Sequence, residues 1–168
     1  STAKDYGMLT AAHAHGDEGM RRAIIAGIKT IEHGTLMEPS TMDLMVKYDA
    51  YLVPTISAGK AAAANAAIPG YFPEVIAKKA LEIGPRSQST FAAAYKKGVK
   101  IAFGTDAGVS PHGDNAKEFG FMVAAGMPVM VAIPAATITN ANLLGYSNSL
   151  GQLKQGYTAD IVAVNEHP

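Results

Sequence analysis

Cysteine is absent from this chain of 168 residues. Disulfide bonds and zinc sites built from thiolates are therefore excluded. Any metal ion that the chain binds must take its ligands from histidine, aspartate or glutamate side chains.

An excess of charge of either sign is also absent, since Lys+Arg and Asp+Glu both total 14. A nucleic-acid-binding protein or one that binds anionic membranes would need a basic excess. No apolar run approaches the roughly 20 residues of a membrane span; the alanines of residues 61–64 are interrupted by Asn65. We therefore expect neither a nucleic acid nor a membrane as partner.

A signal-peptide pattern is missing from residues 1–7, so we expect a cytoplasmic rather than a secreted protein, although the sequence leaves the localisation open. Hydrophobic residues make up 48% of the chain, which is enough for the core of one domain or for part of a larger one.

Strand-like and helix-like segments alternate along the chain. Strands are expected at residues 9–15, 28–32, 51–55, 99–105 and 158–164. Helices are expected from Asp17 to Gly27, after Pro39, over 73–97 with a break at Gly84-Pro85, over 115–125 and over 128–144, with a loop and a short helix over 56–72. In the 73–97 helix we expect Val75, Ile76, Ala80 and Ile83 to pack inward.

This βα alternation predicts an α/β fold with a parallel sheet and helical crossovers. Four βα units are half of an eight-fold TIM-type (β/α)8 barrel. An open half would leave two unpaired strand edges, which indicates that other strands complete it.

Three apolar runs of the chain end in possible metal ligands. His13 and His15 follow the first run, His33 follows the second, and Asp106 follows the run at 101–105. Alternate residues of a strand point the same way, so His13 and His15 could bind one cation; they could equally be hydrogen-bonded polar residues at a strand end. A carboxylate beside a buried strand is costly unless it is paired or coordinated, so Asp106 favours the metal hypothesis. Imidazoles with a carboxylate suit Zn²⁺ or a similar divalent ion.

Other polar residues near these strand ends have weaker signals. His112 and Asn115 lie in the loop after the fourth strand, where either could contact a substrate, while Asn115 could instead cap the following helix. Glu32 should face the opposite side of its strand from His33 and form a structural salt bridge. His167 is expected to have no role.

Five segments together resemble the amidohydrolase superfamily, in its imidazolonepropionase-like and Xaa-Pro dipeptidase branch. They are residues 13–16 (HAHG), 31–34 (IEHG), 103–108 (FGTDAG), 137–145 (TITNANLLG) and 151–162 (GQLKQGYTADIV). The resemblance implies strands five to eight of the barrel over residues 1–145. It further implies a return segment over residues 146–168 that supplies a strand of the small β-sandwich domain.

By this resemblance His13, His33 and Asp106 are metal ligands, and Asp106 is also the catalytic proton acceptor. His15 is not a ligand in the family pattern and would support the loop or contact the substrate. The first-strand His-x-His and the fourth-strand lysine of the family are absent, so the chain supplies part of a site for one or two divalent metals. A second chain, a separate N-terminal piece or a homo-oligomeric partner would complete the barrel.

The resemblance implies hydrolysis of the amide bond of an Xaa-Pro-like dipeptide or an N-acyl amino acid by metal-activated water. Cyclic-amide hydrolysis or deamination is disfavoured, because those branches carry a glutamate shortly after the fifth-strand histidine, where this chain has Ala14, His15 and Gly16. A non-catalytic half-barrel that serves in assembly is the third hypothesis.

Overall fold

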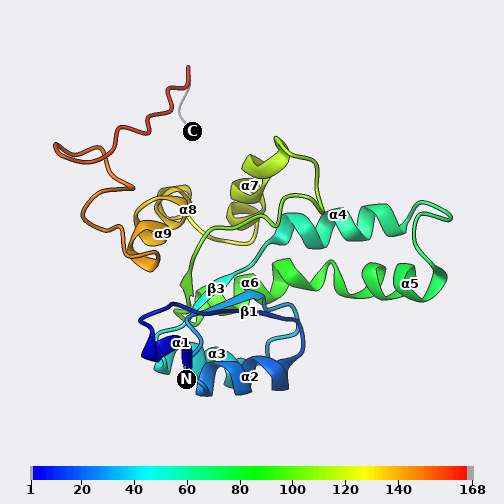
Figure 1. The fold of residues 1–168 in the computed structure, drawn as a ribbon. Coiled ribbons are helices and arrows are strands. Elements are labelled where there is room, and N and C mark those ends of the chain that lie inside the picture. The colour runs from blue at the N-terminus through cyan, green and yellow to red at the C-terminus, as the bar shows by residue number, and fades with distance from the viewer. Residues whose placement is uncertain (1, 166–168) are drawn as a thin grey trace.

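A parallel sheet of four strands forms the centre of the computed structural model, which describes residues 2–165. His167, for which no role is expected, lies outside the described residues. The strands are β1 (Ala11–Ala14), β2 (Thr30–His33), β3 (Tyr51–Val53) and β4 (Lys100–Ile101), in the spatial order β1-β2-β3-β4. Each neighbouring pair is parallel. The predicted α/β class is confirmed (Figure 1).

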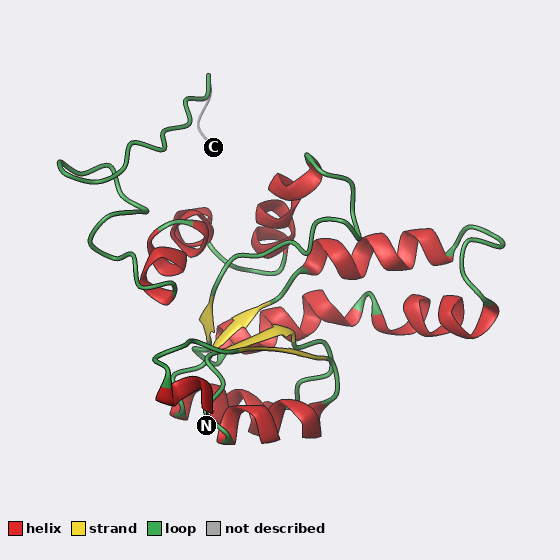
Figure 2. Cartoon of the chain, viewed as in Figure 1, coloured by secondary structure: helices red, strands yellow, loops and turns green. Residues whose placement is uncertain are grey.

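Helices surround the sheet and continue beyond it (Figure 2). They are α1 (Thr2–Asp5), α2 (Asp17–Ile25), α3 (Pro39–Lys47), α4 (Ile56–Ala66), α5 (Glu74–Ile83), α6 (Arg86–Lys96), the 3₁₀ turn η1 (Asp114–Ala116), α7 (Lys117–Ala124), α8 (Val129–Ala136) and α9 (Ile138–Leu143).

The main core lies between one face of the sheet and the helices. Successive strand residues point to opposite faces, so Ile31 and Leu52 enter this core together with Met20, Met45 and Phe91 from α2, α3 and α6. The other face carries Tyr51, Val53 and Ala102, which form a second small apolar cluster that Leu143 of α9 touches. We call this second face the inner face of the sheet.

Helices α4 and α5 run side by side and extend away from the sheet (Figure 1). The expectation of a loop with a short helix over 56–72 is wrong in its proportions, since α4 spans 11 residues. Helix α4 is rich in alanine, which has the highest intrinsic helix propensity of the amino acids, and this explains its length.

The predicted inward packing of α5 is also wrong for Val75 and Ile76, which are 82% and 52% exposed. Ala77, Ala80 and Ile83 are the only partly exposed residues of α5, so this side of the helix, and not the side with Val75 and Ile76, faces its neighbours. The break predicted at Gly84-Pro85 is confirmed, because α5 ends at Ile83 and α6 begins at Arg86.

Strand β4 is shorter than the predicted strand over 99–105, and it pairs only with β3. Beyond Ile101, the N–H of Phe103 donates to the side-chain oxygen of Asn140 at 3.1 Å, and the Asn140 amide donates to the Phe103 carbonyl at 2.9 Å. These bonds to α9 replace strand pairing. The single helix expected over 128–144 is split at Thr137, whose φ of −119° and ψ of −88° are not helical.

No strand forms over 158–164, so the expected β-sandwich strand is wrong for the described structure. Within residues 2–165 no other strand lies beside this segment. A strand needs a hydrogen-bonded neighbour, and without one Val162 stays 88% exposed. The assignment of 146–168 to a return segment stays a prediction.

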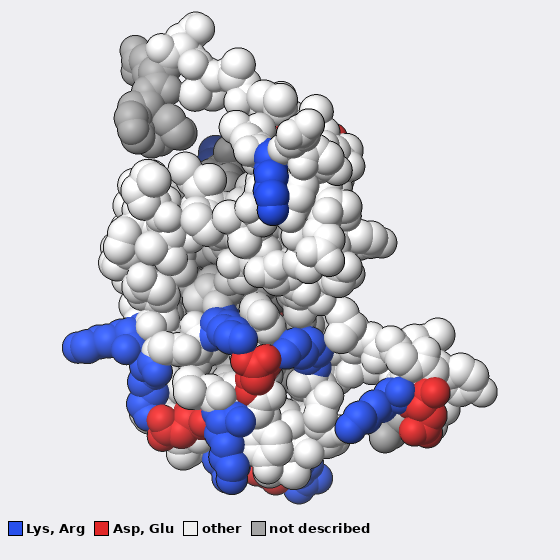
Figure 3. Space-filling view, turned by 90° about the vertical axis from the view of Figure 1, so that its left-hand side faces the viewer, with Lys and Arg blue, Asp and Glu red and all other residues white. Residues whose placement is uncertain are grey.

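Charged side chains of both signs intermingle on the lower part of the face in Figure 3, and the upper part is largely uncharged. Asp49, for example, pairs with both Lys29 and Lys100. Across residues 2–165, the helices are all too short or too polar to cross a membrane.

Candidate metal centre

The carboxyl ends of the four parallel strands meet at one edge of the sheet. His13 lies within β1, His33 ends β2, and Thr55 and Asp106 lie shortly after β3 and β4. His33, Thr55 and Asp106 all have positive φ, at 71°, 46° and 53°. Left-handed backbone is uncommon outside glycine and concentrates where function constrains the chain. The three turns therefore mark this edge as a candidate site.

Three imidazoles gather there. One possible ligand nitrogen from each of His13, His15 and His33 lies within 4.8 Å of the others. The Nδ1 atom of His13 and the Nε2 atom of His33 are 2.8 Å apart. The rings of His15 and His33 are stacked with centroids 4.9 Å apart. The fold thus brings the predicted ligands His13 and His33 together, and His15 lies in the same cluster.

Two threonine hydroxyls hold two of these rings. Thr35 Oγ1 lies 3.0 Å from His15 Nδ1, and Thr55 Oγ1 lies 2.7 Å from His33 Nδ1. Metal-binding histidines typically use one ring nitrogen for the metal and the other for such a bond. Sequence reasoning missed both threonines; their signal is that each follows a strand end by two residues.

The environment favours the neutral form of two of the imidazoles. Burial lowers the pKa of His33, with further lowering from His13 and His15. Burial also lowers the pKa of His15, and His13 adds to the effect. A neutral imidazole has a free lone pair, which is the form that binds metals.

A pocket of about 260 Å³ opens beside the histidines. Asp106 lines this pocket, although the three-histidine cluster does not include it. Much of the remaining wall comes from the first turns of α4, at Ala58, Gly59 and Ala62. The site therefore combines a polar floor with a wall of small apolar residues.

Glu32 lies on the inner face, in register with His13. The predicted salt bridge is wrong: among the described residues Glu32 has no ion-pair partner within 4.0 Å, and its carboxylate accepts a 2.6 Å hydrogen bond from Thr30 Oγ1. Thr30, two residues earlier on the same strand, supplies the hydrogen-bond partner instead. Burial raises the pKa of Glu32, and the nearby Asp106 raises it further.

His112 and Asn115, the predicted substrate contacts after β4, lie outside the histidine cluster. His112 is exposed and does not line the histidine pocket. Asn115 does not cap α7, which begins at Lys117 after Ala116. Asn115 instead donates to Thr105 Oγ1 at 2.9 Å and accepts from the Gly113 N–H, so it fixes the loop that follows Asp106. Substrate contact by either residue stays a prediction.

The donor set fits a divalent metal. It consists of three imidazoles, two of which have a lowered pKa, with a carboxylate beside them, which is the chemistry that Zn²⁺ and similar ions prefer. The assignment of His13, His33 and Asp106 as the ligands stays a prediction, since the three-residue cluster of the structure is His13, His15 and His33.

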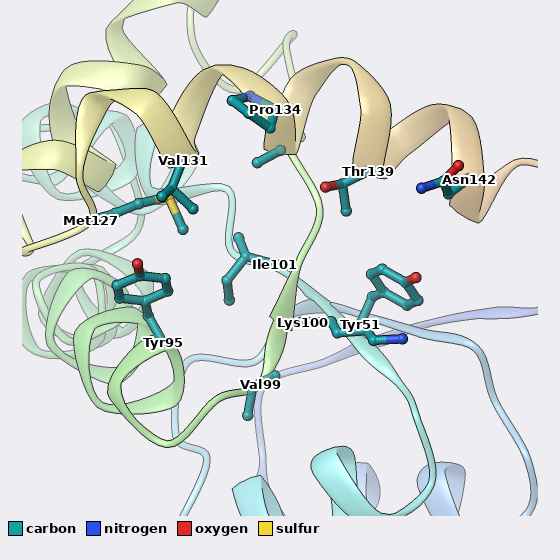
Figure 4. Close-up of a pocket in the computed structure, with 11 residues that line it drawn as sticks. Tyr51, Tyr95, Val99, Lys100, Ile101, Met127, Val131, Pro134, Thr139 and Asn142 are labelled. Atoms are coloured by element: carbon teal, nitrogen blue, oxygen red, sulfur yellow. The ribbon is translucent and has the colours of Figure 1, made fainter. Parts of the chain in front are cut away.

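A second cavity, of about 340 Å³, lies apart from the histidines at the free edge of β4 (Figure 4). Lys100 and Ile101 of β4 line it on one side, and Val131 and Pro134 of α8 line it on the other. Its lining does not include His13, His15, His33 or Asp106, so the candidate metal centre lies elsewhere.

Known proteins resemble this chain over nearly all of its length. Ochratoxinase from Aspergillus niger is 35% identical over 162 residues, which are 95% of this chain and 33% of that protein. A crystal structure of a Xaa-Pro dipeptidase with bound methionine in the active site is 55% identical with a TM-score of 0.91. That alignment covers 94% of this chain and 39% of the dipeptidase chain. The crystal structure of A. niger ochratoxinase has a TM-score of 0.83 at 32% identity, covering 99% of this chain and 38% of that one.

The chain thus spans well under half the length of these relatives. The four strands match part of a TIM-type barrel, so the predicted partial barrel is confirmed. The model of the amidohydrolase family matches residues 1–168. On these grounds the chain belongs to the amidohydrolase family.

Proposed function

We propose that this chain supplies the strand-five, strand-six and strand-eight side of a metal-dependent active site that hydrolyses the amide bond of a dipeptide or an N-acyl amino acid. The convergence of His13, His15 and His33 at the carboxyl edge of a parallel sheet carries the proposal. Membership of the amidohydrolase family and 55% identity to a Xaa-Pro dipeptidase structure support the reaction class.

The chain's own residues have separate tasks in this proposal. His13 and His33 would hold the metal through their facing nitrogens, and the hydroxyl of Thr55 orients the His33 ring. The Asp106 carboxylate accepts a proton from the attacking water and returns it to the leaving nitrogen. A bound divalent metal would polarise the scissile carbonyl and lower the pKa of water.

The pocket beside the cluster supports a small, largely apolar substrate group. Ala58, Gly59 and Ala62 leave space close to Asp106. No lysine or arginine lines this pocket in the described part of the chain, so a substrate carboxylate would be bound by groups outside it.

The proposal includes a partner surface. In the part of the chain that the structure describes, strands β1 and β4 each pair on one side only, and a TIM-type barrel needs eight strands. We propose that further strands, in the same polypeptide or in another, pair with these two edges and cover the inner face.

The experiment is a hydrolysis assay on the purified protein that carries this chain, loaded with Zn²⁺. Its substrates are an Xaa-Pro dipeptide, an N-acyl amino acid and ochratoxin. We expect Asp106→Asn to lower kcat by about 10²–10⁴-fold, since it removes a general base. The matched control Asp114→Asn changes an aspartate that pairs with Lys117 outside the pocket, and should retain wild-type kcat. Equal kcat for wild type and Asp106→Asn would refute the proposal.

A further inference from the structure

Glu118 is a buried carboxylate that takes no part in the site described above. It lies on α7 and is 0% exposed. Its neighbours on the helix are the apolar Phe119, Phe121 and Met122. A buried charge is costly unless it is bonded, so its partners indicate its role.

Within residues 2–165, the hydrogen bonds that the Glu118 carboxylate accepts all come from the start of α4. The Ile56 N–H donates to Oε1 at 2.8 Å, and the Ser57 N–H donates to Oε2 at 2.7 Å. The Ser57 hydroxyl donates to Oε2 at 2.5 Å. Both carboxylate oxygens are thus engaged with the first turn of a helix, whose free N–H groups attract negative charge. Figure 1 shows α7 above this end of α4.

The residue just before these N–H groups is Thr55. Its backbone is left-handed, with φ of 46° and ψ of 47°, which a β-branched residue rarely adopts. Such a conformation persists only where the surroundings hold it. The bonds from Ile56 and Ser57 to Glu118 hold the chain immediately after it.

Thr55 then contacts the metal centre directly. Its hydroxyl lies 2.7 Å from His33 Nδ1, and the opposite nitrogen of that ring, Nε2, faces His13 Nδ1 at 2.8 Å. If Nδ1–H donates to the Thr55 hydroxyl, the lone pair of Nε2 is free for a metal ion.

We propose that Glu118 is a positioning residue for the metal centre: by fixing the turn at Thr55 it holds His33 with Nδ1 protonated and Nε2 directed at the metal position. The chain of contacts runs from α7 through the first turn of α4 to the end of β2. The inference rests on the proposed function for its consequence, but its first effect is on the ring of His33 and is measurable without metal.

Nitrogen-15 NMR of the histidine side chains tests that first effect in the metal-free protein. We expect wild type to hold His33 in the Nδ1–H tautomer, and Thr55→Ser to retain it because the hydroxyl remains. Thr55→Val and Glu118→Gln should shift the ring towards a mixture of tautomers. Ser57→Ala removes one of the three bonds to Glu118 and should have a smaller effect.

Titration with Co²⁺, followed by visible absorption, tests the consequence. Loss of such a supporting bond typically lowers metal affinity about 10–100-fold. We expect that loss for Thr55→Val, a smaller one in the same direction for Glu118→Gln, and none for Thr55→Ser. Circular dichroism checks that each variant is folded; if Glu118→Gln does not fold, Ser57→Ala and the two Thr55 variants carry the test.

The results separate this inference from the proposed function. If wild type binds no Co²⁺ while the tautomer shifts occur, the metal function fails and the positioning role stands. If folded Glu118→Gln, or Ser57→Ala in its place, keeps both the wild-type tautomer and the wild-type affinity, the positioning role is wrong. It is equally wrong if Thr55→Val behaves as wild type in both measurements.

Discussion

At the scale of single residues, the chemistry depends on side chains that the backbone presents in unusual conformations. The sequence predicted His13, His33 and Asp106 because each stands at the end of an apolar run. It did not identify Thr55 or Glu118, since their importance comes from contacts with residues far along the chain. Thr55 and His33 are 22 positions apart, and Ile56 and Glu118 are 62 positions apart. The salt bridge expected for Glu32 was wrong because the residues in register with it on β1 and β3 are His13 and Val53, which the pattern of β2 alone does not show.

The buried carboxylate of Glu118 predicts a pH dependence of stability. Burial raises its pKa above the ordinary value of 4.5, and the hydrogen bonds from Ser57 and Ile56 only partly oppose this. Between that value and the raised folded pKa, the folded protein binds a proton that the unfolded chain releases. Stability from this group is therefore fully present below about pH 4.5 and is lost as the pH rises through the folded pKa.

Urea unfolding at a series of pH values measures this effect. The free energy of unfolding of wild type, minus that of Glu118→Gln, should decrease as the pH rises above 4.5 and then level off. A difference that is constant across the series would show that Glu118 has the same pKa in both states.

Replacement of Gly34 should destabilise the turn after His33, because Gly34 has a φ of 60°. A Cβ at this position would lie 2.6 Å from Leu52 Cδ1 and 3.0 Å from Met37 Cε. We expect Gly34→Ala to lower the free energy of unfolding by about 1–3 kcal/mol. Gly19→Ala is the control in thermal and urea melts: it lies in α2 with open space around it, and should raise stability by about 0.5–1 kcal/mol. If Gly34→Ala left the free energy of unfolding unchanged, the turn would have room for a Cβ and the expectation would be wrong.

At the scale of helices and strands, the periodicity of the sequence predicted which elements exist. It was less successful in predicting which other elements they contact. The order of strands and crossovers, and the break at Gly84-Pro85, follow from local signals. The orientation of α5 does not, because Val75 and Ile76 have helical spacing whether or not another element covers them. The length of β4 depends likewise on Asn140, which belongs to α9.

The pairing of α4 with α5 gives a prediction at this scale. A Cβ on Gly84 would lie 2.5 Å from the Gly59 carbonyl oxygen and 2.9 Å from Ala63 Cβ, both on α4. Gly84→Ala should therefore separate the helices and lower the free energy of unfolding by about 1–3 kcal/mol. The control Gly120→Ala, on α7 with open space around it, should not destabilise the protein in the same urea melts. Equal stability of Gly84→Ala and wild type would contradict the close approach.

At the scale of the whole molecule, four parallel strands form part of a barrel. The sequence predicted this by counting βα units, and the relatives confirm it. The strand expected over 158–164 was not found, since an isolated segment cannot show which strand it pairs with. The inner face and the two sheet edges are what the rest of the barrel would cover.

Hydrogen exchange measures whether those edges are covered. In the 168-residue chain alone, we expect amides of the edge strands β1 and β4 to exchange faster than those of β2, which is paired on both sides. In a protein that also contains the remaining strands, the edge strands should be protected as well as β2. Fast exchange at both edges in that larger protein would argue against barrel closure.

The central claim is that His13 and His33 bind a divalent metal, and calorimetric titration of Zn²⁺ into chelator-treated protein tests it most directly. We predict that wild type binds Zn²⁺, and that His13→Ala and His33→Ala each weaken binding by at least about 100-fold, since each removes a ligand. His112→Ala, a change to an exposed histidine outside the pocket, should bind as wild type does. Wild-type affinity in both His13→Ala and His33→Ala, or no binding by wild type, would contradict the account.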